Sequence, residues 1–244
     1  MIGIPTGPLV AAEAKGIFMT PGVPRHASFI WKLRRQPFVR TLWSNRQLCL
    51  RVADTVCAAP ATTLEFGIND LQHLSRFEQT TSWLTRDDFL SLSRKHCEQR
   101  DCYIITVVDA QGPLLGYGMA QANAVESHFS EVDQRVRWPD RTGTMFSGFV
   151  HPSARGCGIH SMLHVARINF LICECGMRWA VGAVEADNVS AMHSSQKTTN
   201  FRLAAILETR FRLGFPLRAV TAIDSTFDAQ FLDAPLREAS GSHP

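Results

Sequence analysis

Residues 150–160 read Val150-His151-Pro152-Ser153-Ala154-Arg155-Gly156-Cys157-Gly158-Ile159-His160. An apolar run, residues 145–150, ends at this stretch, and the pattern predicts an amphipathic helix directly after it. A strand, a glycine loop and a helix N-terminus in succession present unpaired backbone N–H groups and partial positive charge to an anion. Gly156 and Gly158 allow a close approach because they carry no Cβ. The stretch therefore predicts a cradle for a phosphate group.

The loop matches neither of the common nucleotide-binding motifs. It lacks the Gly-Lys-Ser/Thr of a P-loop and the third glycine of a dinucleotide fingerprint. It resembles the pyrophosphate loop of the GNAT superfamily of N-acetyltransferases, written Arg/Gln-x-x-Gly-x-Gly/Ala. Arg155 and Gly158 fill the first two defined positions, and His160 replaces the last small residue.

A second motif strengthens this resemblance. Residues 184–191, Val-Glu-Ala-Asp-Asn-Val-Ser-Ala, match the Val-x-x-x-Asn-x-x-Ala pattern that follows the loop helix in GNAT domains. The motif's Asn188 stands 30 residues after Gly158. The two motifs at this separation are more specific than either alone, and the resemblance covers roughly residues 62–224.

The resemblance implies acetyl-CoA as co-substrate and assigns cofactor-binding roles. The backbone of Phe149 and Val150 would meet the pantetheine arm, and Asn188 would contact the cofactor or order a water beside the thioester. The pyrophosphate would lie against the loop, which consists of Arg155, Gly156, Cys157, Gly158, Ile159 and His160.

The chemistry implied is direct attack of an amine on the thioester carbonyl, which requires a general base and a proton for the departing thiolate. At the place of the tyrosine that the family often carries about seven residues after the asparagine, this chain has Ser195. Ser195 is the candidate catalytic residue at this place, although a serine hydroxyl is a much weaker acid than the phenol of tyrosine. The common glutamate on the strand before the loop is absent. Glu185 is the remaining candidate for the base, and its alternative interpretation is a solvated carboxylate at a strand end.

His160 has three interpretations. Its side chain clashes with the phosphates and marks a degraded site, or it points away and leaves only its N–H toward the ligand, or it donates to a phosphate oxygen when protonated. His160 and His164 also share one helix face at a spacing that suits a metal. The sequence places no third ligand nearby, so we expect a polar helix face and no metal.

The expected element order is strand, two helices, three strands, helix, strand, helix and two strands. Residues 69–77 and 85–98 are the two helices, with Asn69 as the expected cap of the first, and residues 126–142 read as a polar connection. This order predicts an α+β protein with the GNAT fold. Its central sheet is expected to be mixed, mostly antiparallel, with about six or seven strands flanked by helices.

Three segments are expected along the chain. Residues 1–60 form a basic extension that is irregular and then, over residues 28–56, helical. Residues 61–224 form the acyltransferase domain, and residues 225–244 form a polar C-terminal tail. The first segment has a net charge of +6 and the remainder −3. The extension could therefore dock on the acidic domain, meet an acidic partner or a lipid surface, or act as a targeting segment.

Composition restricts the location. The seven cysteines are scattered without a Cys-x-x-Cys pair, which favours a reducing, cytoplasmic compartment over a disulfide framework. No apolar run approaches the ~18 residues of a membrane span.

The sequence thus predicts a GNAT N-acetyltransferase that acts on a primary amine of a small molecule or, second, of a peptide. A catalytically degenerate CoA-binding module and an enzyme with an acyl carrier protein as donor stay open as alternatives. A tRNA-directed enzyme is a minor alternative, because the basic extension is sparse in Lys and Arg and has few interleaved aromatic residues.

Overall fold

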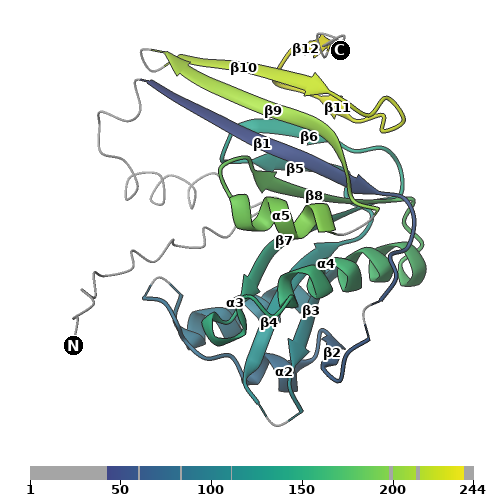
Figure 1. The fold of residues 1–244 in the computed structure, drawn as a ribbon. Coiled ribbons are helices and arrows are strands. Elements are labelled where there is room, and N and C mark those ends of the chain that lie inside the picture. The colour runs from purple at the N-terminus through teal and green to yellow at the C-terminus, as the bar shows by residue number, and fades with distance from the viewer. Residues whose placement is uncertain are drawn as a thin grey trace, which may run out of the picture.

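The architecture is built around one large sheet (Figure 1). The structure is a computed structural model and describes residues 43–59, 61–82, 84–110, 112–197, 200–212 and 215–238. Within these residues the main sheet has nine strands in the order β12-β10-β9-β1-β8-β7-β4-β3-β2. Their bounds are β1 Trp43–Ala53, β2 Glu65–Ile68, β3 Cys102–Val108, β4 Leu114–Gln121, β7 Thr142–Val150, β8 Trp179–Glu185, β9 Arg202–Arg212, β10 Phe215–Ala222 and β12 Leu236–Glu238.

Neighbouring strands are antiparallel except for the pairs β7–β8 and β10–β12. The expected α+β class with a mixed, mostly antiparallel sheet is therefore confirmed, although the sheet is wider than six or seven strands. The additional strands come from the two ends of the described chain.

The helix expected over residues 28–56 is wrong for residues 43–53. They form β1, which pairs with β8 on one side and β9 on the other. The physical reason is the central place of this strand, because Leu48, Leu50 and Val52 are buried on one face and Cys49, Arg51 and Ala53 are buried on the other. The extension placed before residue 60 thus supplies a strand to the main sheet, and residues 28–42 of the expected helix lie outside the described residues.

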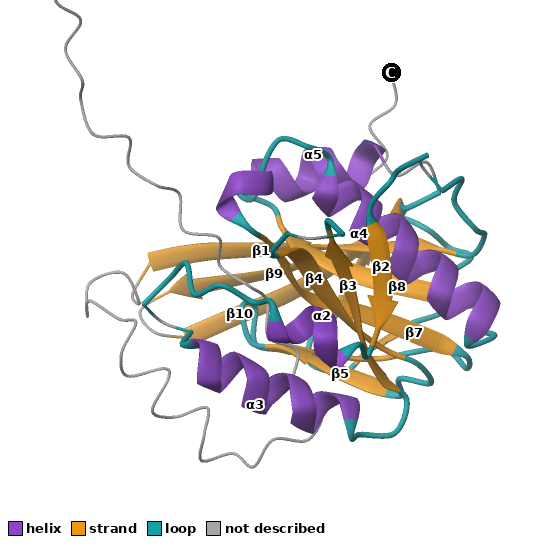
Figure 2. Ribbon diagram, turned by 90° about the horizontal axis from the view of Figure 1, so that it is seen from below, coloured by secondary structure: helices purple, strands orange, loops and turns teal. Residues whose placement is uncertain are grey.

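Helices cover both faces of the main sheet (Figure 2). Helices α2 (Leu71–Ser75) and α3 (Arg86–Cys97) lie on one face, where Leu74, Phe77 and Phe89 join a buried cluster with Tyr117 of β4. Helix α4 (Ile159–Asn169) packs on the opposite face, together with α5 (Val189–Lys197). A five-residue π-helical turn, Phe170–Glu174, continues α4.

The N-terminal cap of α2 lies one residue later than the sequence predicts, and the cap of α3 lies where it was predicted. Asp70, and not Asn69, caps α2, because its carboxylate accepts from the N–H groups of Gln72 and His73. Asn69 has a φ of 52° and accepts from the N–H of Ile104 instead. Thr85 caps α3 as the capping box predicts.

A small second sheet, β11-β6-β5, is formed by residues expected to be irregular. Strands β5 (Glu126–Phe129) and β6 (Gln134–Arg137) replace the expected polar connection, because Phe129, Gln134 and Val136 are buried while their neighbours remain exposed. Strand β11 (Gln230–Phe231) and strand β12 come from the expected polar tail. The tail therefore pairs with both sheets within residues 230–238.

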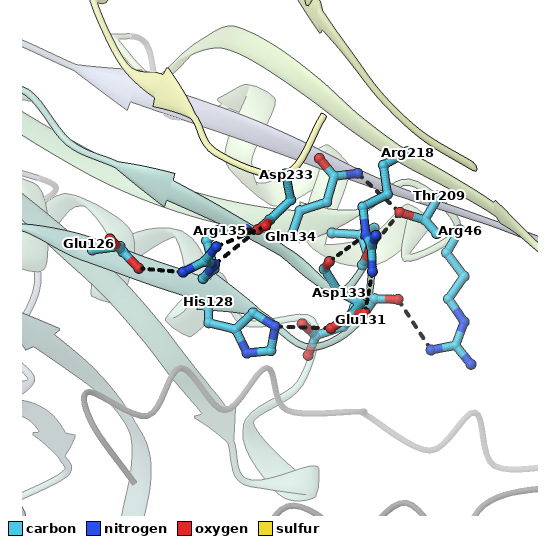
Figure 3. A network of polar contacts seen from close by, with 11 residues as sticks. Arg46, Glu126, His128, Glu131, Asp133, Gln134, Arg135, Thr209, Arg218 and Asp233 are labelled. Atoms are coloured by element: carbon cyan, nitrogen blue, oxygen red, sulfur yellow. Dashed lines mark hydrogen bonds and ion pairs between the residues drawn. The ribbon is translucent and has the colours of Figure 1, made fainter. Parts of the chain in front are cut away.

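Polar side chains join the two sheets, and we call them the inter-sheet network (Figure 3). Arg135 binds Asp233 at 3.0 Å and Arg218 of β10 binds Asp133 at 2.6 Å. Gln134 donates to the hydroxyl of Thr209 on β9 at 3.0 Å. The other members are Arg46, Glu126, His128 and Glu131.

The cysteines and the length of the helices add two observations. All seven cysteines are free thiols. In the described part of the chain, no helix combines the length and apolar character needed to cross a membrane.

Candidate functional site

The parallel strands β7 and β8 separate at their C-terminal ends. They pair from Thr142 opposite Trp179 to Met145 opposite Gly182, and both then continue without pairing to each other. The separation coincides with an irregularity in β7 opposite β4, where Ser147 has a φ of 48°. Because a non-glycine residue in this conformation costs ~1–2 kcal/mol, the surrounding structure must hold β7 in this bend.

The bend leaves a backbone edge of β7 open toward β8. His151 donates its N–H to Leu115, so this residue and Phe149 face β4. Since successive residues of a strand point their N–H and C=O groups to opposite sides, Val150 faces the gap. Of the two residues expected to meet a pantetheine arm, Val150 therefore has suitable backbone geometry. The backbone of Phe149 pairs with Tyr117 of β4, and its ring stacks on the Tyr117 ring with 5.4 Å between the ring centroids.

The glycine loop has the conformation that its sequence predicts. Gly156 and Gly158 have φ values of 82° and 79°, in the left-handed region that favours glycine. A Cβ at Gly156 would have no neighbour within 4 Å, and one at Gly158 would meet only the Cε of Met162 at 3.9 Å. Gly158 is the N-cap of α4 and has no side chain that could accept from the first turn. The N–H groups of that turn have no acceptor within the helix, so they remain available at the open loop.

A pocket of about 80 Å³ lies where β7 and β8 separate. It contacts the ends of both strands, one side of α4 and the start of α5. Its lining residues are Met145, Phe146, Ser147, Gly148, His160, His164, Arg167, Gly182, Ala183, Val184, Asn188 and Ala191. His160 and Asn188 are the residues predicted from the sequence that the structure brings together here.

The side chain of His160 lies between α4 and α5. Its Nδ1 is 2.9 Å from the hydroxyl of Ser194, which is itself 2.8 Å from the hydroxyl of Ser161. Burial and the neighbouring Arg167 lower the pKa of His160 to about 4, so the ring is neutral at pH 7. The ring is thus directed to α5 and not over Gly156, and the backbone N–H of His160 stays in the first turn of α4.

Asn188 caps α5 with its side chain. Its Oδ1 accepts from the N–H of Ala191 at 3.1 Å, and the residue also lines the pocket. The carbonyl oxygen therefore serves the helix, and the amide NH2 is the part of Asn188 that a ligand could use.

The two predicted catalytic residues do not line the pocket. Ser195 is fully buried, and its hydroxyl donates to the carbonyl of Met192 within α5. Glu185 ends β8, where its backbone pairs with Leu48 of β1. By strand alternation Glu185 shares a face with Ala183, which packs on the α2–α3 side of the sheet.

Arg167 is a pocket residue that sequence reasoning missed. It is 3% exposed and lies over the bare backbone of β4, since a Cβ at Gly118 would be 2.7 Å from its Cζ. Its Nε donates to the carbonyl of Leu163, and its Nη1 donates to that of Phe146 at 3.3 Å. A helical arginine seven residues after His160 is on the same face, and this spacing was the available signal.

The arrangement of strand, glycine loop, helix and separating parallel strands is that of a GNAT-like α+β fold, as the sequence resemblance predicted. The chain is similar to AAC(6')-Iy in complex with a CoA bisubstrate analogue, at 14% identity over 57% of this chain and 90% of that one, with a TM-score of 0.41. It is similar to a GCN5-related N-acetyltransferase from Sphaerobacter thermophilus, at 14% identity over 81% of this chain and 60% of that one, with a TM-score of 0.47.

A third similar structure is an acetyltransferase of the GNAT family from Colwellia psychrerythraea. The identity is 15%, the shares covered are 70% of this chain and 57% of that one, and the TM-score is 0.43. No protein-family model and no curated protein matches the sequence.

Proposed function

We propose that the protein is an acyl-CoA-dependent N-acyltransferase that transfers an acetyl or other short acyl group to a primary amine. The observation that carries the proposal is the open glycine loop at the start of α4 beside the separated ends of β7 and β8. The loop and the first-turn N–H groups would hold the diphosphate of CoA, and the side chain of Arg155, exposed in the loop, would add positive charge.

The pantetheine arm would follow β7. Its amide groups suit the N–H and C=O of Val150, because these face the gap that β8 has left. The amide NH2 of Asn188 would donate to the cofactor or to a water beside the thioester. The acyl group would then reach the pocket where the strands separate.

Attack by the amine needs a proton acceptor, and Glu185 is our candidate. It stands on the α2–α3 side of β8, so an amine would approach from the face opposite to the glycine loop. Ser195 is not proposed as an acid, because its hydroxyl is buried and donates to Met192. The seven free thiols suit a reducing compartment, and we propose a cytoplasmic location on that basis.

The test is thermal unfolding with and without acetyl-CoA. At ~100 times Kd the ligand should add about 2.7 kcal/mol to the free energy of unfolding. We expect Gly158→Trp to abolish this gain, because the indole fills the open loop. Gly158→Ala is the matched control, since it imposes the same left-handed strain without the bulk and should keep most of the gain.

Two results would contradict the proposal. If saturating acetyl-CoA does not change the unfolding temperature of the native chain, acetyl-CoA is not the donor. Binding without thiol release across a panel of amines would make the protein a CoA-binding module and not an enzyme.

A further inference from the structure

The pocket between β7 and β8 contains a buried positive charge that has no counter-ion among the described residues. Burial lowers the pKa of Arg167 to about 10, which keeps the guanidinium charged at pH 7. None of the ion pairs between described residues includes Arg167. Because a buried charge is costly unless it is paired, a pocket-lining arginine of this kind indicates an anionic ligand.

Two nitrogen donors converge on one open point of this pocket. A Cβ built on Gly148 would lie 3.8 Å from Nη2 of Arg167 and 3.8 Å from Nε2 of His160, with no other atom within 4 Å. If Ser194 donates to Nδ1 of His160, the Nε2 carries the proton and becomes a donor. With that tautomer, the space above Gly148 is lined by a cation and a neutral N–H.

His164 provides an independent sign of a missing partner. Its ring lines the pocket in an edge contact with His160, at 4.6 Å between ring centroids. The residue is 6% exposed, and its buried Nδ1 has no hydrogen-bond partner among the residues that the structure describes. Buried polar atoms are normally paired, so an unpaired one in a pocket wall points to a ligand or a water there.

We propose that this pocket binds a carboxylate of a reactant, held by Nη2 of Arg167 and Nε2 of His160 above Gly148. The inference rests on the proposed function for the identity of the reactant. The carboxylate would end the acyl group of the donor, as in malonyl-CoA, or belong to an α-amino acid that acts as acceptor.

The chemistry of the pocket favours a carboxylate over a phosphate. The pocket offers one full positive charge, because burial also lowers the pKa of both histidines and keeps their rings neutral at pH 7. A dianionic phosphate would leave one charge uncompensated in a space of about 80 Å³. A planar monoanion fits two donors at one point.

The first arm of the test varies the donor. Dissociation constants are measured by calorimetry for malonyl-CoA and isovaleryl-CoA, whose acyl groups have the same shape but end in a carboxylate and in two methyl groups. The second arm varies the acceptor in the presence of acetyl-CoA, by comparing lysine with cadaverine and phenylalanine with phenethylamine. We expect at least a tenfold preference for the carboxylate partner in one arm.

Two variants test the pocket. Arg167→Met removes the charge, and Gly148→Ala places a methyl group at the point where the donors converge without a contact closer than 3.8 Å. Both should reduce the preference to less than threefold, and Gly148→Ala keeps the test valid if Arg167→Met fails to fold. Arg100→Met is the matched control, because the Arg100 side chain is 95% exposed.

The outcomes separate this inference from the proposed function. Two results would overturn the inference and leave the proposed function standing. In the first, CoA thioesters bind but neither arm shows a preference for the carboxylate partner. In the second, a preference is found but both variants retain it. If no CoA thioester binds, the proposed function fails, and monomethyl malonate, a monoanion at pH 7, decides the pocket. Stabilisation by monomethyl malonate that depends on Arg167 supports the inference, and its absence overturns it.

Discussion

The inter-sheet network and the pocket at α4 differ in how their arginine side chains are paired. In the network, Arg135 and Arg218 each meet an aspartate at 3.0 and 2.6 Å (Figure 3). In the pocket, Arg167 is more deeply buried, yet its bonded partners are two backbone carbonyls. Charges that only join structural elements can be paired within the chain, because pairing removes their cost. On our proposal, the charge of Arg167, which has no ion-pair partner among the described residues, marks a ligand site, whereas the paired charges of the network mark structural contacts.

The largest effect should appear when pH is lowered from about 6.5 to 4. The pKa of His160 is about 4 when folded and 6.5 when unfolded, so the unfolded chain binds more protons in this window. Stability therefore falls as pH falls, by up to about 3 kcal/mol from this ring. Asp233 of the network does not contribute there, because Arg135 holds its pKa below the usual range and that stabilisation is lost only below about pH 4. Burial raises the pKa of Glu131, so this carboxyl acts in the opposite direction to His160 as pH falls.

Denaturant unfolding at a series of pH values checks this prediction. His160→Asn should flatten the dependence on pH between 6.5 and 4, while His164 and His96, whose pKa values burial also lowers, keep the remaining slope. The same substitution at the exposed His193 should leave the slope unchanged. An equal slope in His160→Asn and the native chain would contradict the assignment.

The second prediction supplies the pocket with a carboxylate from the chain itself, so that Arg167 gains a paired charge like those of the inter-sheet network. Gly148→Asp would place a carboxylate between Arg167 and His160, where a Cβ has no contact closer than 3.8 Å. A charge-assisted hydrogen bond should raise the free energy of unfolding by about 2 kcal/mol relative to Gly148→Asn, the uncharged control of equal shape. The two variants are compared by thermal unfolding at pH 7, and an aspartate variant less stable than the asparagine variant would refute the prediction.

The smallest effect removes a neutral contact of the network. Thr209→Val deletes a buried hydroxyl that accepts from Gln134 and donates to the carbonyl of Val132. We expect a loss of about 1 kcal/mol in denaturant unfolding, with Thr209→Ser largely restoring it. The stabilisation by acetyl-CoA should not change in either variant; a change would show that the two regions are coupled.

Spacing along the chain predicted the parts of the site that depend on backbone. Gly156 and Gly158 were predicted because the loop conformation requires glycine, and Asn188 was predicted from its place in a motif that resembles the family's pattern. That Asn188 also caps α5 was learned from the structure. Arg167 was missed because its role depends on β4, where Gly118 leaves room for the guanidinium. No pattern within α4 reports what lies across from it.

The fold was predicted in its central part and missed at its ends. Residues 102–121 and 142–185 alternate or repeat clearly, and their strands and helix follow the expectation. In β1 the apolar residues fit both a helix and a strand, and only pairing with β8 and β9 decides between them. Strands β5 and β6 are short and polar on one side, so burial of Gln134 against Thr209 is needed to recognise them.

The position of β1 has a consequence for how the chain folds. Strands β8 and β9 follow each other in sequence but do not pair, since β1 lies between them. The ribosome releases β1 before every other described strand, and its two partners follow more than a hundred residues later, as β8 (Trp179–Glu185) and β9 (Arg202–Arg212). Its contacts are therefore among the most distant in the sequence, which makes sheet closure a late and slow step. Until β8 and β9 have emerged, the backbone of β1 has neither of its pairing partners, so the nascent chain carries the apolar segment of Leu48 and Leu50 as an unpaired strand over that interval.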